Sequence, residues 1–159
     1  PESELARVFK DYGEESRAKQ LAAKIVEHRQ EQKITTNVQL NEIIKMVKGY
    51  QKDKHPSKNI YQAIRIEVNN ELHVITDSLH QAIEMLKVDG RVLVISFHSL
   101  EDVTTKRVFY EYKKQIIETP MENKHLYHTL KTVYPTPAEV EANKASRSAK
   151  MRVIIKKHE

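Results

Sequence analysis

The chain has 159 residues, of which 39% are hydrophobic and 31% are charged, a composition typical of globular rather than disordered proteins. Its length suits one domain, or one domain with a small satellite, and the absence of cysteine excludes disulfides and thiolate metal sites. No stretch approaches the roughly 18 apolar residues of a membrane-spanning helix, and a net charge of +5 favours a polyanionic partner.

Helical patterns occupy the first third of the chain. Apolar residues recur at helical spacing over residues 5–12, 18–26 and 40–47. Gly13 is expected to end the first helix and Gly49 the third. Thr36 and Gln39 have the spacing of a capping box, which predicts where the third helix begins. The polar segment that follows, with Pro56, is a plausible boundary.

A fourth helical pattern is unusually long. One apolar stripe runs from Ser57 to Val88 without Gly or Pro, which is longer than a small domain is wide. A break or kink is therefore expected near Asn69 and Asn70, and Asp89 with Gly90 is expected to end the helix.

The most informative segment is GRVLVISFHSLED, from Gly90 to Asp102. Its continuous apolar run, Val92–Phe97, predicts a strand buried on both faces, as in parallel sheets covered by helices. Ligands of such sheets bind beyond the carboxyl ends of the strands. Polar side chains gather at that end: Ser96, His98, Ser99, Glu101 and Asp102.

A helix, two strands and a short helix are expected after that strand. Ser99 and Asp102 resemble a capping box and predict a helix that runs to about Glu118. A weaker strand is expected over residues 126–133, and a short helix through Glu141. In the last strand, apolar residues alternate with Lys150, Arg152 and Lys156. The chain shows one strand of the parallel type but no neighbouring βα unit to lie beside it. The sequence therefore predicts that the chain is the later part of a longer protein.

Two interpretations of Ser96, His98 and Ser99 remain open. A hydrolase would use one serine as nucleophile and His98 as its base. The glycine-flanked G-x-S-x-G elbow is absent, so a structural or substrate-shaping role is favoured, with Ser99 capping the helix.

Further binding candidates lie on both sides of this segment. His55 precedes Pro56 and is held extended, so it could contact a substrate or merely begin a helix. Arg65 and Asn69 are four residues apart on one helix face and could bind phosphate and a base edge, or form an ordinary polar surface. The histidine spacings predict no metal site, and no phosphate-binding glycine loop is present.

Basic residues are concentrated at the C-terminal end. Within the last sixteen residues, six cations are opposed only by Glu159. This region, which includes Arg147, Lys150 and Arg152, either contacts a polyanion or forms a solvated tail.

Four segments, in this order, resemble the later part of the MraW-type methyltransferases. They read DYGEESRAKQLAAKIVEHR, HPSKNIYQAIRIEVNNEL, GRVLVISFHSLED and NKASRSAKMRV, and the similarity is weakest from Ile117 to Glu139. The resemblance implies an S-adenosylmethionine-dependent enzyme that methylates the exocyclic N4 of a cytidine in small-subunit ribosomal RNA. Asn59, Tyr61 and Ala145 depart from residues that are common in the family. With Arg147, Lys150 and Arg152, the basic C-terminal region becomes the candidate for contacts with the RNA backbone.

The resemblance also implies an α/β layout. Residues 1–54 would be part of a helical substrate-recognition insertion, and residues 55–159 the C-terminal half of a Rossmann-like methyltransferase sheet. Residues 90–97 would be its fifth strand, and residues 126–133 and 149–155 its terminal antiparallel pair. The substrate-binding candidates become His55, Arg65, Asn69, Ser96, His98 and Ser99.

The resemblance implies that the family's cofactor loop and catalytic acid would lie upstream of Pro1. The chain alone is therefore expected to be inactive and to hold no S-adenosylmethionine tightly, with its catalytic residues unknown. A stand-alone RNA-binding module is the alternative. Further expectations are a cytoplasmic location, no membrane contact, and self-association or strand exchange through the incomplete sheet.

Overall fold

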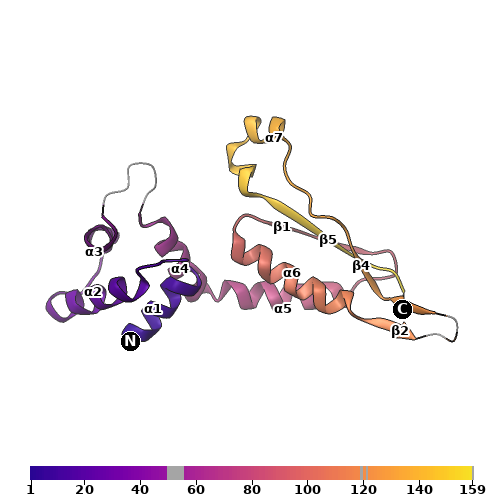
Figure 1. Ribbon diagram of the computed structural model, residues 1–159, viewed down its shortest axis with the longest axis horizontal. Coiled ribbons are helices and arrows are strands. Elements are labelled where there is room, and N and C mark those ends of the chain that lie inside the picture. Colours follow the sequence, from indigo (N-terminus) through magenta and orange to yellow (C-terminus); the bar gives the residue numbers. More distant parts are fainter. Residues whose placement is uncertain (50–55, 119, 121, 159) are drawn as a thin grey trace. The chain divides into compact units, whose positions relative to one another are not determined.

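The computed structural model describes residues 1–49, 56–118, 120 and 122–158 (Figure 1). These form two compact units, Pro1–Glu71 and Leu72–Glu159. The units therefore divide later in the chain than the predicted boundary at residues 54 and 55. The combination of helices with small antiparallel sheets confirms the α/β class.

The N-terminal unit is a helical bundle. Its helices are α1 (Glu2–Asp11), α2 (Ala18–Glu31), α3 (Asn37–Lys48) and α4 (Lys58–Asn69). They meet in one core, in which the side chains of Phe9, Leu21, Ile44 and Ile60 are fully buried. Burial of such large apolar side chains is the main source of stability for the bundle.

Gly13 lets α1 approach α4 closely. A Cβ atom at this position would lie 2.7 Å from the carbonyl oxygen of Phe9, 3.2 Å from that of Asn59 and 3.3 Å from the Cβ of Ala63. A larger residue would therefore clash with the Phe9 carbonyl and require α4 to move by a few tenths of an ångström.

Local signals predicted the helix ends in this unit well. The capping box of Thr36 and Gln39 is confirmed, and Gly49 ends α3 with a φ of 73°. The predicted break in the long helical pattern is confirmed at Asn70, which has left-handed angles of φ 51° and ψ 38°. Asparagine tolerates this conformation better than most residues. Beyond it α5 (Glu71–Glu84) begins.

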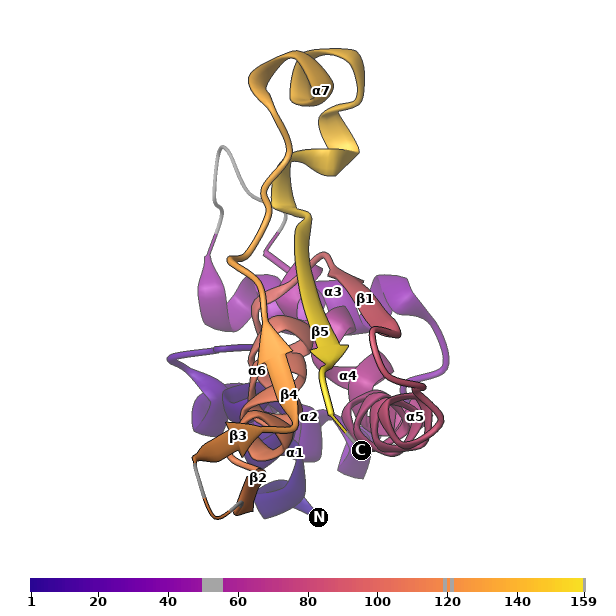
Figure 2. The same ribbon diagram turned by 90° about the vertical axis from the view of Figure 1, so that its right-hand side faces the viewer.

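A three-stranded antiparallel sheet forms the centre of the C-terminal unit. The strand order is β1 (Arg91–Ser96), β5 (Lys150–Lys156) and β4 (Tyr127–Thr129), with β5 in the middle (Figure 2). The predicted antiparallel pairing of the last two strands is confirmed, although β4 is shorter than expected and only a single bridge joins Val133 to Met151.

The remaining elements of this unit follow β1. Helix α6 (Ser99–Lys113) ends before the predicted Glu118, because a short hairpin of β2 (Ile116–Glu118) and β3 (Asn123–His125) follows it. Between β4 and β5, α7 (Pro137–Ala142) and a 3-10 helix (Lys144–Ser148) form an excursion beyond the strand ends (Figure 1). The short helix expected through Glu141 is thus confirmed.

The prediction that β1 is buried on both faces was wrong. Val92 and Val94 pack against the core formed by α5, α6, β4 and β5, but Leu93 and Ile95 are 56% and 59% exposed. The strand pairs antiparallel with β5, and within the described residues helices cover only one sheet face. A continuous apolar run therefore does not distinguish one covered face from two. Self-pairing through this strand stays a prediction.

Candidate functional site

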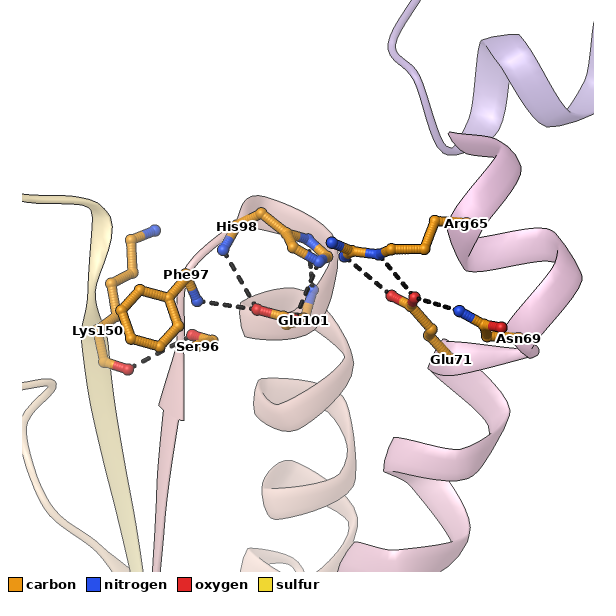
Figure 3. Close-up of polar contacts among 8 residues, drawn as sticks. All are labelled: Arg65, Asn69, Glu71, Ser96, Phe97, His98, Glu101 and Lys150. Atoms are coloured by element: carbon orange, nitrogen blue, oxygen red, sulfur yellow. Dashed lines mark hydrogen bonds and ion pairs between the residues drawn. The ribbon is translucent and has the colours of Figure 1, made fainter. Parts of the chain in front are cut away.

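The end of β1 is organised by a capping box around His98 and Glu101 (Figure 3). The Glu101 Oε2 accepts hydrogen bonds from the backbone N–H groups of Phe97 at 2.8 Å and His98 at 3.3 Å. In return, the Glu101 N–H donates to Nδ1 of His98 at 3.4 Å. The first residue before α6 is therefore His98, and the predicted cap by Ser99 with Asp102 was wrong. Histidine is not among the usual capping residues.

Both ring nitrogens of His98 face Glu101. Its Nε2 lies 3.0 Å from Glu101 Oε1, with an alignment too poor for a hydrogen bond, while Nδ1 accepts from the backbone. Neither nitrogen is therefore available to remove a proton from a serine. The hydrolase interpretation lacks the base it needs.

Of the two serines, only one is accessible. Ser96 is 3% exposed, and its hydroxyl donates to the Lys150 carbonyl oxygen at 3.4 Å, which fastens β1 to β5. Ser99 is exposed as the first residue of α6. Ser96 therefore has a structural position, and Ser99 is the one of the pair that a ligand could reach.

Asp102 holds two cations of β5. Its carboxylate binds Arg152 in a bidentate manner, from Nε to Oδ1 at 2.7 Å and from Nη2 to Oδ2 at 3.1 Å. Lys150 adds a contact at 3.3 Å. The hydrogen bond from Arg152 holds the pKa of Asp102 below its usual range, although burial opposes ionisation. Two of the expected RNA-backbone cations thus have a partly buried counter-ion.

A second cluster lies within the N-terminal unit (Figure 3). Arg65 donates from Nε and Nη2 to the two carboxylate oxygens of Glu71, at 2.7 Å and 3.1 Å. Asn69 also donates to Glu71, at 3.3 Å. The structure therefore joins the two predicted residues through a carboxylate that crosses the helix break. The Arg65 side chain remains 54% exposed.

The other candidates have less defined surroundings. His55 lies outside the described residues. Arg147 lies in the 3-10 helix and lines an open cavity of about 760 Å³ together with Pro135, Pro137 and Lys144. Among the described residues, no cluster of three metal-ligating side chains occurs, and no helix is long and apolar enough to span a membrane.

Sequence reasoning missed the roles of Glu71 and Glu101. Glu71 lies six residues after Arg65, a spacing that does not share a face of one continuous helix. Glu101 lies three residues after His98, as in a capping box, but a histidine in the first position hides that signal.

The described residues do not provide a cradle for the implied S-adenosylmethionine. A Cβ at Gly13 or Gly90 would lie 2.7 Å from its own chain's Phe9 or Lys87 carbonyl, so these glycines serve chain packing. Gly49 ends a helix with open space around it. A cavity beside α6 has about 160 Å³, well below the roughly 300–1,000 Å³ of typical small-molecule sites. The cavity of about 760 Å³ at Arg147 is large enough, but it is open and no glycine is among the described residues that line it.

The comparison with protein families gives a clear result. A model of the MraW methylase family matches residues 1–157, which is nearly the whole chain. The match includes both polar clusters and the sheet that supports one of them. The chain therefore belongs to the MraW methylase family, a family of methyltransferases.

Proposed function

We propose that this chain is part of an enzyme that methylates the exocyclic N4 amino group of a cytidine in small-subunit ribosomal RNA. The observation that carries this proposal is the family match over residues 1–157. The net charge of +5 supports it, because a basic protein attracts the phosphate backbone of RNA. The same proposal places the protein in the cytoplasm, with no membrane partner.

The reaction makes particular demands on the protein. The lone pair of a cytosine amino group is delocalised into the ring, so the base must be held in an accurate position. A base in structured RNA must also be turned out and recognised by its polar edge. The chain would supply RNA contacts for this purpose: the Arg65 side chain, which is 54% exposed and which Glu71 orients, and the exposed residue Ser99.

The methyl donor would be S-adenosylmethionine, held by residues other than those described. The packing of Gly13 and Gly90 against their own chain supports this part of the proposal. The 159-residue chain by itself is accordingly expected to transfer no methyl group and to bind the donor weakly.

Methyl transfer tests the proposal. The protein as its source cell produces it is incubated with tritium-labelled S-adenosylmethionine and unmethylated small ribosomal subunits, with large subunits as the control. Label is expected in the small-subunit RNA and not in the large-subunit RNA. Label in neither RNA, with a folded protein and intact subunits, would contradict the proposal.

An RNA-binding module without catalysis is the second candidate. The packing of Gly13 and Gly90 against their own chain favours this candidate if the chain acts alone, because these glycines then do not hold a methyl donor. It predicts that the source protein binds small-subunit RNA without labelling it. The same experiment, with filter binding measured on each sample, therefore separates the two candidates.

A further inference from the structure

Two lysines that form no ion pair within the described residues border a small cavity in the C-terminal unit. It has a volume of about 160 Å³ and lies between α6 and the strands β4 and β5. Lys106, Tyr110 and Lys113 of α6 line it, three and four residues apart and therefore on one face of the helix. Neither lysine forms an ion pair within the described part of the chain, and both are exposed.

Arg152 adds an oriented guanidinium to the same cavity. Asp102 binds its Nε and Nη2, which fixes the side chain on β5. Arginine has five N–H donors, and its Nη1 group has no hydrogen-bond partner among the described residues. Asp102 therefore positions Arg152 and leaves donors for an anion.

The rest of the cavity can contact a ring or a sugar. Phe109 and Val153 form buried apolar walls, and Thr129 also lines the cavity. The Tyr110 ring is 56% exposed, and the Nζ of Lys114 lies 4.3 Å from its centroid, which adds a further positive charge nearby. Cations beside an exposed aromatic ring are the combination that binds single-stranded nucleic acids.

We propose that this cavity binds one nucleotide unit of an RNA strand, with its phosphate on Lys106, Lys113 and Arg152 and its base or ribose against Tyr110. The choice of RNA as the source of the nucleotide rests on the proposed function. A cavity of about 160 Å³ takes only part of a nucleotide, so the phosphate would enter it while the base or ribose would lie against the exposed Tyr110. The proposed contacts with the RNA backbone therefore include lysines of α6 in addition to the C-terminal strand.

The test compares two double variants of the 159-residue chain with equal loss of charge. Lys106→Met/Lys113→Met removes the cavity lysines, and Lys87→Met/Arg107→Met removes exposed cations outside it. Binding of a fluorescein-labelled single-stranded RNA is followed by anisotropy from low to high salt. The cavity variant is expected to bind about tenfold more weakly, with a salt slope lower by about 1.4 for two phosphate contacts. The control is expected to change less than twofold.

Further arms separate the sources of the phosphate. Cytidine monophosphate and inorganic phosphate are used as competitors, and Tyr110→Leu is expected to weaken RNA binding about fivefold. Equal affinity of the two double variants for RNA would overturn the proposal that this cavity binds RNA. Competition by cytidine monophosphate at the same concentration as RNA would overturn the assignment to a strand.

A measurement on the wild-type chain guards against misfolded variants. On titration with RNA, the backbone amide signals of Thr129, Leu130 and Val153 are expected to shift in NMR spectra. Shifts confined to other residues would also overturn the proposal. If RNA binds at the cavity as expected but the source protein transfers no methyl group, the proposed function is contradicted and the binding site is not.

Discussion

Asp102 shows how one carboxylate serves both stability and the placement of cations. It is 6% exposed and bound by Arg152 and Lys150 from a strand far away in the sequence. A buried carboxylate with two partners contributes to stability because its removal leaves the partners' donors unsatisfied.

Replacing Asp102 by asparagine is expected to lower the free energy of unfolding at pH 7 by about 1–3 kcal/mol. The pKa of Asp102 is lowered by Arg152, so its contribution is present above the ordinary value of 3.8 and is lost as the pH falls through the folded-state pKa. Urea unfolding at several pH values measures this. The matched control is Asp89→Asn. Asp89 forms an exposed ion pair with Lys157, so this substitution should change the free energy of unfolding much less. Equal losses in both variants would count against the role of Asp102.

Tyr112 is the second residue with a clear energetic signature. It is 5% exposed, and its hydroxyl donates to Glu84 at 3.1 Å and lies 3.0 Å from Nδ1 of His80. Burial, and then the neighbouring carboxylate, raise the pKa of Tyr112 to about 12.

Stability is therefore expected to fall as the pH rises from about 10 to about 12, because the unfolded chain ionises first. Tyr112 accounts for roughly 2–3 kcal/mol of this loss. Tyr112→Phe should flatten the profile of unfolding free energy against pH in this range, whereas Tyr134→Phe, at an exposed ring, should leave it as in the wild type. A wild-type profile in Tyr112→Phe would show that another group causes the alkaline loss.

At the scale of elements, the start of α6 depends on the carboxylate of Glu101. This side chain accepts two backbone N–H groups that would otherwise lack a partner at the helix start. The polar residues at the end of β1 are thus held by the helix that follows the strand.

Glu101→Ala is expected to destabilise the chain by about 1 kcal/mol and to speed amide hydrogen exchange at Phe97 and His98. Glu101→Gln keeps an acceptor oxygen and should show a smaller effect on both measurements. Unchanged exchange at Phe97 and His98 in the alanine variant would mean that the capping box has no energetic role.

Elements that local signals define were predictable from the sequence. The Thr36 cap, the Asn70 break and the alternation in β5 depend on residues within a few positions of one another. Interactions between distant residues were not. The pairing of Asp102 with Arg152 spans fifty positions, and the exposure of Leu93 depends on which elements cover the sheet. The β2–β3 hairpin was missed because its strands have three residues each and lack a clear alternation.

At the scale of the whole molecule, pairing changes the meaning of the basic C-terminal end. Lys150 and Arg152 bind Asp102, and Lys157 binds Asp89 at 2.9 Å. Lys144 and Arg147 form no ion pair within the described residues. Net charge alone predicts a polyanionic partner, whereas the structure shows which of these cations already have a counter-ion within the described residues.

The most direct measurement is the identity of the nucleoside that the source protein methylates. Small-subunit RNA from the methyl-transfer reaction is digested to nucleosides and analysed by mass spectrometry against synthetic standards. The expected product is N4-methylcytidine. A methyl group only on a ribose, on another cytosine atom or on another base would contradict the proposed function.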